Sequence, residues 1–247
     1  MQMKKYFLVL LMLLFSATGW GQAKIYTKKA RIADFQTKTT KVVLSGNPLL
    51  DATLREEVAS RWRISPYEFC SVADYEALKD KTLYYFLRLA TDSDFAYLIL
   101  TKGGPKEDLD PLKERFDVIS LPVSSAGLAS GRGLVYMSAF VDIIQNYMEK
   151  AILSDKAAYV GITAERIPSG RKVLLDSDEA DRAFAASTPG VLAGLIISPA
   201  AGGRGTHCYK MLIATDDHRL HYFKKERIRS GEEPDFNQRD RARLKNK

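Results

Sequence analysis

Short apolar runs alternate with amphipathic segments along this chain, and that alternation limits the folds open to it more than any other feature. The run KVVLSG at residues 41–46 is typical of a strand. The segment that follows places Leu50, Leu54, Val58 and Trp62 four residues apart, which is the spacing of one helix face. Because a strand followed by a helix indicates an α/β unit, we predict an α/β fold, with an α+β arrangement as the alternative.

The same order of elements occurs twice. Residues 71–78 and 177–184 share a serine at the start, an alanine and a large apolar residue at equal spacing. An apolar run precedes each segment and two more follow it. This echo predicts two similar strand-helix-strand-strand halves that form mixed sheets.

The pattern also divides the chain. A polar lead-in occupies residues 22–40, and the first α/β half occupies 41–123. A flexible loop and a long amphipathic helix fill 124–154, and the second half spans 155–223, where it ends in a hairpin. Within the second half, AAYVGIT at 157–163 is a strand candidate. The long helix is therefore expected to join the two halves.

The N-terminus has the layout of a secretory signal peptide. Two lysines precede an apolar run at 6–15, and small residues follow it. The predicted signal peptide is 1–21, cut between Gly21 and Gln22, with a cut after Ala23 as the alternative. A spanning helix needs about 20 apolar residues, so this run is too short to remain as an anchor. No cysteine follows the run, so we expect a periplasmic or secreted protein that is not a lipoprotein by this signal.

Most of the formal charge of +7 comes from the C-terminus. Residues 224–247 hold nine basic and five acidic side chains, whereas 22–223 hold 26 basic and 25 acidic ones. A balanced body lacks the basic face of a nucleic-acid-binding protein, so no nucleic-acid partner is expected. The charged tail is predicted to be disordered, and the alternative is an electrostatic contact with an anionic surface.

Cys70 and Cys208 are the two cysteines of the chain. In an exported protein they could form one disulfide, which would tie the second half to the first. Two buried free thiols are the alternative, and two cysteines give no spacing pattern that separates these outcomes.

All three histidines lie within THCYKMLIATDDHRLHYF, a stretch whose residues suggest a metal or catalytic site. The turn-forming residues 216–218 lie between two apolar runs and predict a hairpin, with 216–218 as its exposed turn. In that register His207 faces Ile228, roughly 23 Å along the ladder from His221 at ~3.3 Å per residue. His218 and His221 would point to opposite faces of a strand. We therefore expect no shared metal ion.

Two acidic pairs and two glycine-rich runs are weaker candidates. Asp92 and Asp94 flank a serine, as do Asp176 and Asp178, but neither pair begins a D-x-D-x-D-G calcium loop. We interpret these aspartates as caps. The runs SGRG at 130–133 and GGRG at 202–205 could hold an anion through backbone N–H groups, yet neither matches a P-loop, and flexible loops are the commoner meaning. The chain also lacks the G-x-S-x-G nucleophile elbow of serine hydrolases.

The segment RWRISPYEFCS at 61–71, followed by the strand-like TLYYFLRL, resembles a group of uncharacterised secreted α/β proteins typical of the Bacteroidota. The likeness covers most of the body and brings no catalytic residue with it. A looser likeness joins the first α/β unit to the N-terminal domain of TolB-type and CsgG-type envelope proteins, at the level of fold alone.

These patterns assign no catalytic, cofactor-binding or metal residue, and no cofactor is expected. We predict an exported cell-envelope protein that acts as a non-enzymatic binding or scaffolding module, with an envelope protein or glycan as its partner. One alternative is a periplasmic enzyme with a carboxylate- or loop-based site. The other is peripheral association with a membrane or polysaccharide through the basic C-terminal tail.

Overall fold

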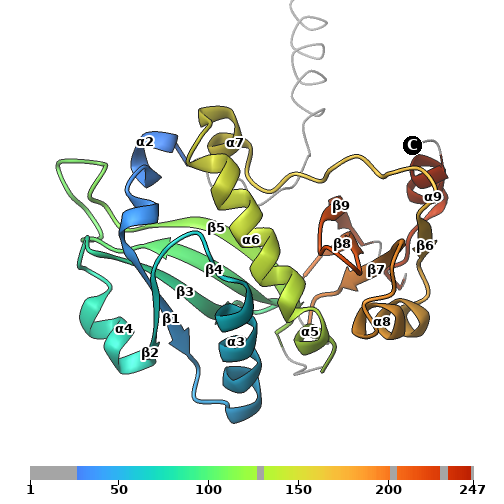
Figure 1. Ribbon diagram of the computed structural model, residues 1–247, viewed down its shortest axis with the longest axis horizontal. Coiled ribbons are helices and arrows are strands. Elements are labelled where there is room, and N and C mark those ends of the chain that lie inside the picture. Colours follow the sequence, from blue (N-terminus) through green and yellow to red (C-terminus); the bar gives the residue numbers. More distant parts are fainter. Residues whose placement is uncertain (1–26, 127–130, 201–204, 229–232, 246–247) are drawn as a thin grey trace, which may run out of the picture.

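A computed structural model describes residues 27–126, 131–200, 205–228 and 233–245. The predicted signal peptide and its cleavage residues Gly21 and Gln22 lie outside these ranges. Within them, helices and two mixed sheets form an α/β fold, which confirms the predicted fold class (Figure 1). The described part of the chain contains no helix with the length and apolar character needed to cross a membrane.

The elements of the first half are, in chain order, α2 (Lys29–Ile32), the 3-10 helix η1 (Phe35–Thr37), β1 (Thr39–Leu44), α3 (Pro48–Arg61), β2 (Tyr67–Ser71), α4 (Val72–Leu78), β3 (Tyr84–Thr91), β4 (Phe95–Lys102) and β5 (Phe116–Ser125). The connecting and second-half elements are α5 (Gly131–Val135), α6 (Met137–Ala151), α7 (Asp155–Val160), β6 (Lys172–Leu174), α8 (Ser177–Ala185), β7 (Val191–Ile197), β8 (His207–Ala214), β9 (Leu220–Arg227) and α9 (Gln238–Lys245).

The first sheet has the strand order β2-β1-β3-β4-β5. β1 runs parallel to both β2 and β3, and the remaining pairs are antiparallel. Helices α3 and α6 pack together and bury the apolar side of this sheet, while α4 covers Val43, Cys70 and Phe86 on the other side. Layers of this kind are what a strand-helix alternation predicts.

Helix α3 shows how local chemistry sets the first half. The side chain of Asn47 accepts hydrogen bonds from two backbone N–H groups at the helix start, and Pro48 occupies the first turn. Leu54 and Val58 are buried as the four-residue spacing predicts. Trp62 ends the helix, and its ring N–H donates to Ser65 Oγ at 3.0 Å, so the buried indole has a polar partner.

The second sheet has the order β6-β7-β8-β9. β6 and β7 are parallel across helix α8, and the other two pairs are antiparallel. One face packs into the main core with α6 and α8, and the other packs against Phe236 and the residues near α9. The repeated element order is thus present, with one difference: β1 lies between the strands that flank α4, whereas β6 and β7, which flank α8, are neighbours.

A single core joins the halves. The main buried cluster takes residues from both sheets and from α6, in which Phe140, Ile144 and Met148 are fully buried. At the junction the rings of Phe95 and Tyr209 pack edge to face with their centroids 5.1 Å apart. In Figure 1 helices α5 and α6 lie between the two sheets, as expected for the joining helix.

Three segments differ from the predictions. The polar lead-in contains α2 and η1, and it buries Ile32 and Phe35 because these apolar side chains fill the core beside α3. Residues 157–163 were expected to form a strand, but α7 extends to Val160. Ser154 caps it by accepting from Ala157 N, and this cap outweighs the short apolar run.

The segment 224–247 is the largest difference. The prediction of a disordered tail is wrong for its described residues, because β9 continues to Arg227 and α9 follows. Phe236 is fully buried beneath the second sheet, where Gly194 leaves room for its ring. Asp240 is also fully buried, and a charge there requires partners.

Candidate functional site

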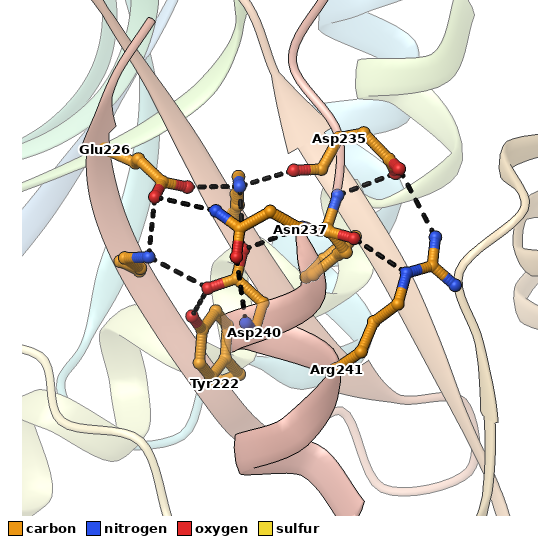
Figure 2. Close-up of polar contacts among 9 residues, drawn as sticks. Tyr222, Glu226, Asp235, Asn237, Asp240 and Arg241 are labelled. Carbon is orange, nitrogen blue, oxygen red and sulfur yellow. Dashed lines mark hydrogen bonds and ion pairs between the residues drawn. The ribbon is translucent and has the colours of Figure 1, made fainter.

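Asp240 finds its partners in a network of nine residues that holds α9 on the second sheet (Figure 2). Its carboxylate accepts hydrogen bonds from Lys210 at 2.8 Å, Lys224 at 2.8 Å and Tyr222 at 2.7 Å. Burial acts to raise the pKa of Asp240, but the bonds from both lysines and the tyrosine outweigh it and lower the pKa to about 2.

Lys210 is the other buried charge of this network. It pairs with Glu226 as well as Asp240, and it also donates to the Asp235 carbonyl. Burial acts to lower the Lys210 pKa, but the two carboxylates raise it above its usual value. These contacts join β8 and β9 to Asp240, so the network anchors the C-terminal helix.

A second polar cluster joins the halves through His218. Its Nδ1 lies 2.7 Å from Asp142 Oδ2 on α6, and Arg61 at the end of α3 donates to the same carboxylate at 3.0 Å. The imidazole stacks on Phe184 with ring centroids 5.2 Å apart. His218 is buried and has a φ of 55°, so the expectation of an exposed turn is wrong for this residue. The cluster serves as an inter-half contact.

The other two histidines occupy separate places. His221 is the extra residue of a β-bulge, and its Nδ1 lies 2.9 Å from the Arg166 carbonyl. That bulge belongs to a register in which His207 pairs with Arg227, one residue from the predicted Ile228. In the described part of the chain, no group of three or more His, Cys, Asp or Glu side chains could hold a metal ion.

His207 lines the candidate site, an open pocket of about 220 Å³ between the two sheets. The β3–β4 turn and the start of β4 supply one wall, and the ends of β8 and β9 supply the other. Its lining residues are Asp92, Asp94, Phe95, Tyr97, Gly205, Thr206, His207, Tyr209 and Lys225. Both halves therefore contribute polar side chains to one cavity, which is typical of binding sites.

The two aspartates build the pocket wall. Asp92 Oδ1 accepts from the N–H groups of Asp94 and Phe95, at 2.8 and 2.7 Å, and so fixes the β3–β4 turn. Asp94 Oδ1 accepts from Gly205 N at 2.9 Å, which joins the turn to the approach of β8. A Cβ at Gly205 would lie 2.4 Å from Pro199 and 2.9 Å from Asp94, so this close approach requires glycine.

Charge in the pocket is mixed. Burial acts to raise the pKa of Asp92, but backbone hydrogen bonds, Tyr97 and the charge of Lys225 lower it, which keeps the carboxylate ionised. Burial, with Lys225 and Arg227 nearby, lowers the pKa of His207, which keeps the imidazole neutral near pH 7. The Lys225 ammonium lies over the Tyr209 ring, 5.5 Å from its centroid.

The remaining sequence candidates have structural roles. Asp176 caps α8 by accepting from the N–H groups of Asp178 and Glu179, as predicted for a cap. In the first glycine-rich run, 131–133 begin α5, and Arg132 pairs with Asp181 at 2.8 Å, so its guanidinium is already occupied. Residues 130 and 202–204 lie outside the described ranges.

Cys70 and Cys208 are both free and buried, and they belong to different sheets. The disulfide alternative is therefore not formed. Burial raises the pKa of each thiol, which favours the unreactive protonated form.

Sequence reasoning found His207 and the Asp92–Asp94 pair but did not place them together. It missed Tyr97, Tyr209 and Lys225, because each lies in a run that reads as an ordinary strand. The alternation of side chains between the two faces of β8 and β9 was the signal that could have placed Tyr209 and Lys225 together. Tyr209 and Lys225 are direct neighbours in the ladder and share a face.

The chain matches no family model, no curated protein and no solved structure. The resemblance to secreted Bacteroidota proteins and to TolB-type and CsgG-type domains stays a prediction.

Proposed function

We propose that this protein is a non-enzymatic binding module, exported to the cell envelope, which holds a small polar ligand in the pocket between its two sheets. The observation that carries this proposal is the convergence of Asp92, His207 and Lys225 from separate elements on one open pocket. A volume of about 220 Å³ suits a small metabolite better than a polymer segment.

The hydrogen bonds that the polar groups of the pocket already make favour binding over catalysis. Asp92 Oδ1 and Asp94 Oδ1 already accept backbone hydrogen bonds, which ties both carboxylates to the wall. In the described part of the pocket, His207 has Thr206 beside its Nδ1 and no carboxylate hydrogen bond that would make it a strong base. Such groups suit ligand recognition, where fixed donors and acceptors matter more than proton transfer.

Association through the basic C-terminal tail is the weaker alternative. Lys224 is committed to Asp240 and Glu226, and Arg241 donates to Phe236 O. Deletion from Lys224 onward would remove half of β9 and all of α9, so it would damage the fold and could not test surface association alone.

The test is an NMR titration of ¹⁵N-labelled protein with separate panels of free amino acids, monosaccharides and dicarboxylates. We expect amide shifts to change at residues 92–97, 205–209 and 225. Thr206→Trp places a large ring at the exposed rim of the pocket and should abolish these changes. Ser169→Trp is the matched control, because Ser169 is exposed on a turn outside the pocket. Binding that persists in Thr206→Trp, or the absence of binding in every panel, would overturn the proposal.

A further inference from the structure

The pocket between the sheets holds charges of both signs that do not neutralise each other. Within the described residues, Lys225 Nζ has no carboxylate within 4 Å, whereas its neighbour Lys224 pairs with Glu226 and Asp240. Asp92 and Asp94 likewise have no cationic partner within 4 Å among the described side chains. Asp94 and Lys225 are half-buried and Asp92 is exposed, so these charges remain open to a ligand in the pocket.

Tyrosine side chains of the pocket lining lie beside the charges of each sign. Tyr97 and Tyr209 both line the pocket, and the Tyr97 hydroxyl lowers the pKa of the nearby Asp92 carboxyl. Lys225 is held over the Tyr209 ring. The pocket therefore presents a carboxylate near Tyr97 and an ammonium over Tyr209, with aromatic surface beside both.

Donors and acceptors divide along the same line. His207 adds to the cationic end, because Thr206 can donate to its Nδ1 and leave the hydrogen on Nε2 free for a ligand. Asp94 adds to the anionic end through its second carboxylate oxygen, whose partner within the described structure is the neighbouring Ser93 hydroxyl. A ligand of single charge would satisfy one end and meet like charge at the other.

We infer that the ligand is a small zwitterion of the free amino-acid class, with its carboxylate on Lys225 and His207 and its ammonium on Asp92 and Asp94. This inference rests on the proposed function, since it names the ligand of the same pocket. Each ligand charge then gains a charge-assisted hydrogen bond to a pocket side chain of opposite charge.

The experiment measures the affinity of each of the free α-amino acids by calorimetry, beside the N-acetyl and the amide derivative of each binder. Acetylation removes the ammonium and amidation removes the carboxylate. We expect at least one free amino acid to bind, and each derivative to bind roughly tenfold or more weakly, as loss of one charged hydrogen bond predicts.

Variants separate the two ends. Lys225→Gln should remove the preference for the free acid over its amide, and Asp92→Asn should remove the preference for the free amine over its N-acetyl form. Lys172→Gln is the matched control, because Lys172 is exposed on β6 at the opposite edge of the same sheet.

The outcomes distinguish this inference from the proposed function. If sugars or simple acids bind in a Thr206→Trp-sensitive manner and free amino acids do not, the pocket is a binding site and the zwitterion inference is wrong. Equal affinity for a free amino acid and its N-acetyl form would also contradict it. If no probe binds, both the zwitterion inference and the proposed function are wrong.

Discussion

Replacing Asp240 by asparagine should destabilise the protein by about 3 kcal/mol. The carboxylate is fully buried and accepts from Lys210, Lys224 and Tyr222. Removing one partner of a buried ion pair typically costs about 3–5 kcal/mol, and Glu226 still pairs with Lys210, which places the expected value at the lower end. In a protein of this size the change corresponds to a Tm decrease of roughly 6–12 °C.

The stabilisation that the Asp240 carboxylate provides should depend on pH. The folded pKa of Asp240 is lowered to about 2 from 3.8. The stabilisation is therefore complete above pH 3.8 and is lost as the pH falls through 2. This lowering of the pKa corresponds to about 2 kcal/mol of stability. We expect the free energy of unfolding in urea to fall more steeply between pH 5 and pH 2 for the wild-type protein than for Asp240→Asn.

Two further variants complete the assay. Glu56→Gln removes an exposed carboxylate from α3 and is the control, with an expected change within about 0.5 kcal/mol. The double variant Lys210→Met with Asp240→Asn should cost less than the sum of its single variants, because each single variant already loses the Lys210–Asp240 ion pair and the sum counts that loss twice. If Asp240→Asn has the same unfolding midpoint as Glu56→Gln at pH 7, the network does not anchor α9.

Three other predictions concern packing and thiols. Gly194→Ala should lower stability by roughly 1–3 kcal/mol in urea unfolding, because the new methyl group would meet Phe236 and backbone at about 3 Å; an unchanged midpoint would mean that α9 shifts freely. Asp142→Asn should cost roughly 1–3 kcal/mol by the same measurement, since it weakens the contact between halves, and a neutral result would remove that role. Cys70 and Cys208 should react slowly with a thiol reagent in the native protein and yield two thiols per chain in denaturant, whereas no thiol signal in denaturant would indicate a disulfide.

Local patterns predicted most of the fold because each reflects a local physical cause. The four-residue spacing through Leu54 and Val58 marks a helix face whatever surrounds it, and helix α3 is found there. The repeated element order likewise predicted two halves with mixed sheets. Strand pairing was not accessible in this way, because the insertion of β1 beside β3 depends on long-range contacts.

The C-terminal segment and the pocket were not predicted because they too depend on long-range contacts. A run rich in charge and poor in apolar residues normally stays solvated, yet Asp240 is buried because Lys210, thirty residues earlier, supplies the opposite charge. The pocket depends on Asp92 and Lys225 lining one cavity from different sheets, and neither residue carries a local signal of that placement. Pairings between distant charges need the tertiary structure.

The most direct test of the central claim is a crystal structure of the full chain grown with the tightest-binding amino acid of the panel at saturation. We predict one ordered ligand in the pocket between the sheets, with its carboxylate within hydrogen-bond distance of Lys225 and its ammonium within hydrogen-bond distance of Asp92. A ligand ordered elsewhere on the protein, with that pocket empty, would contradict it.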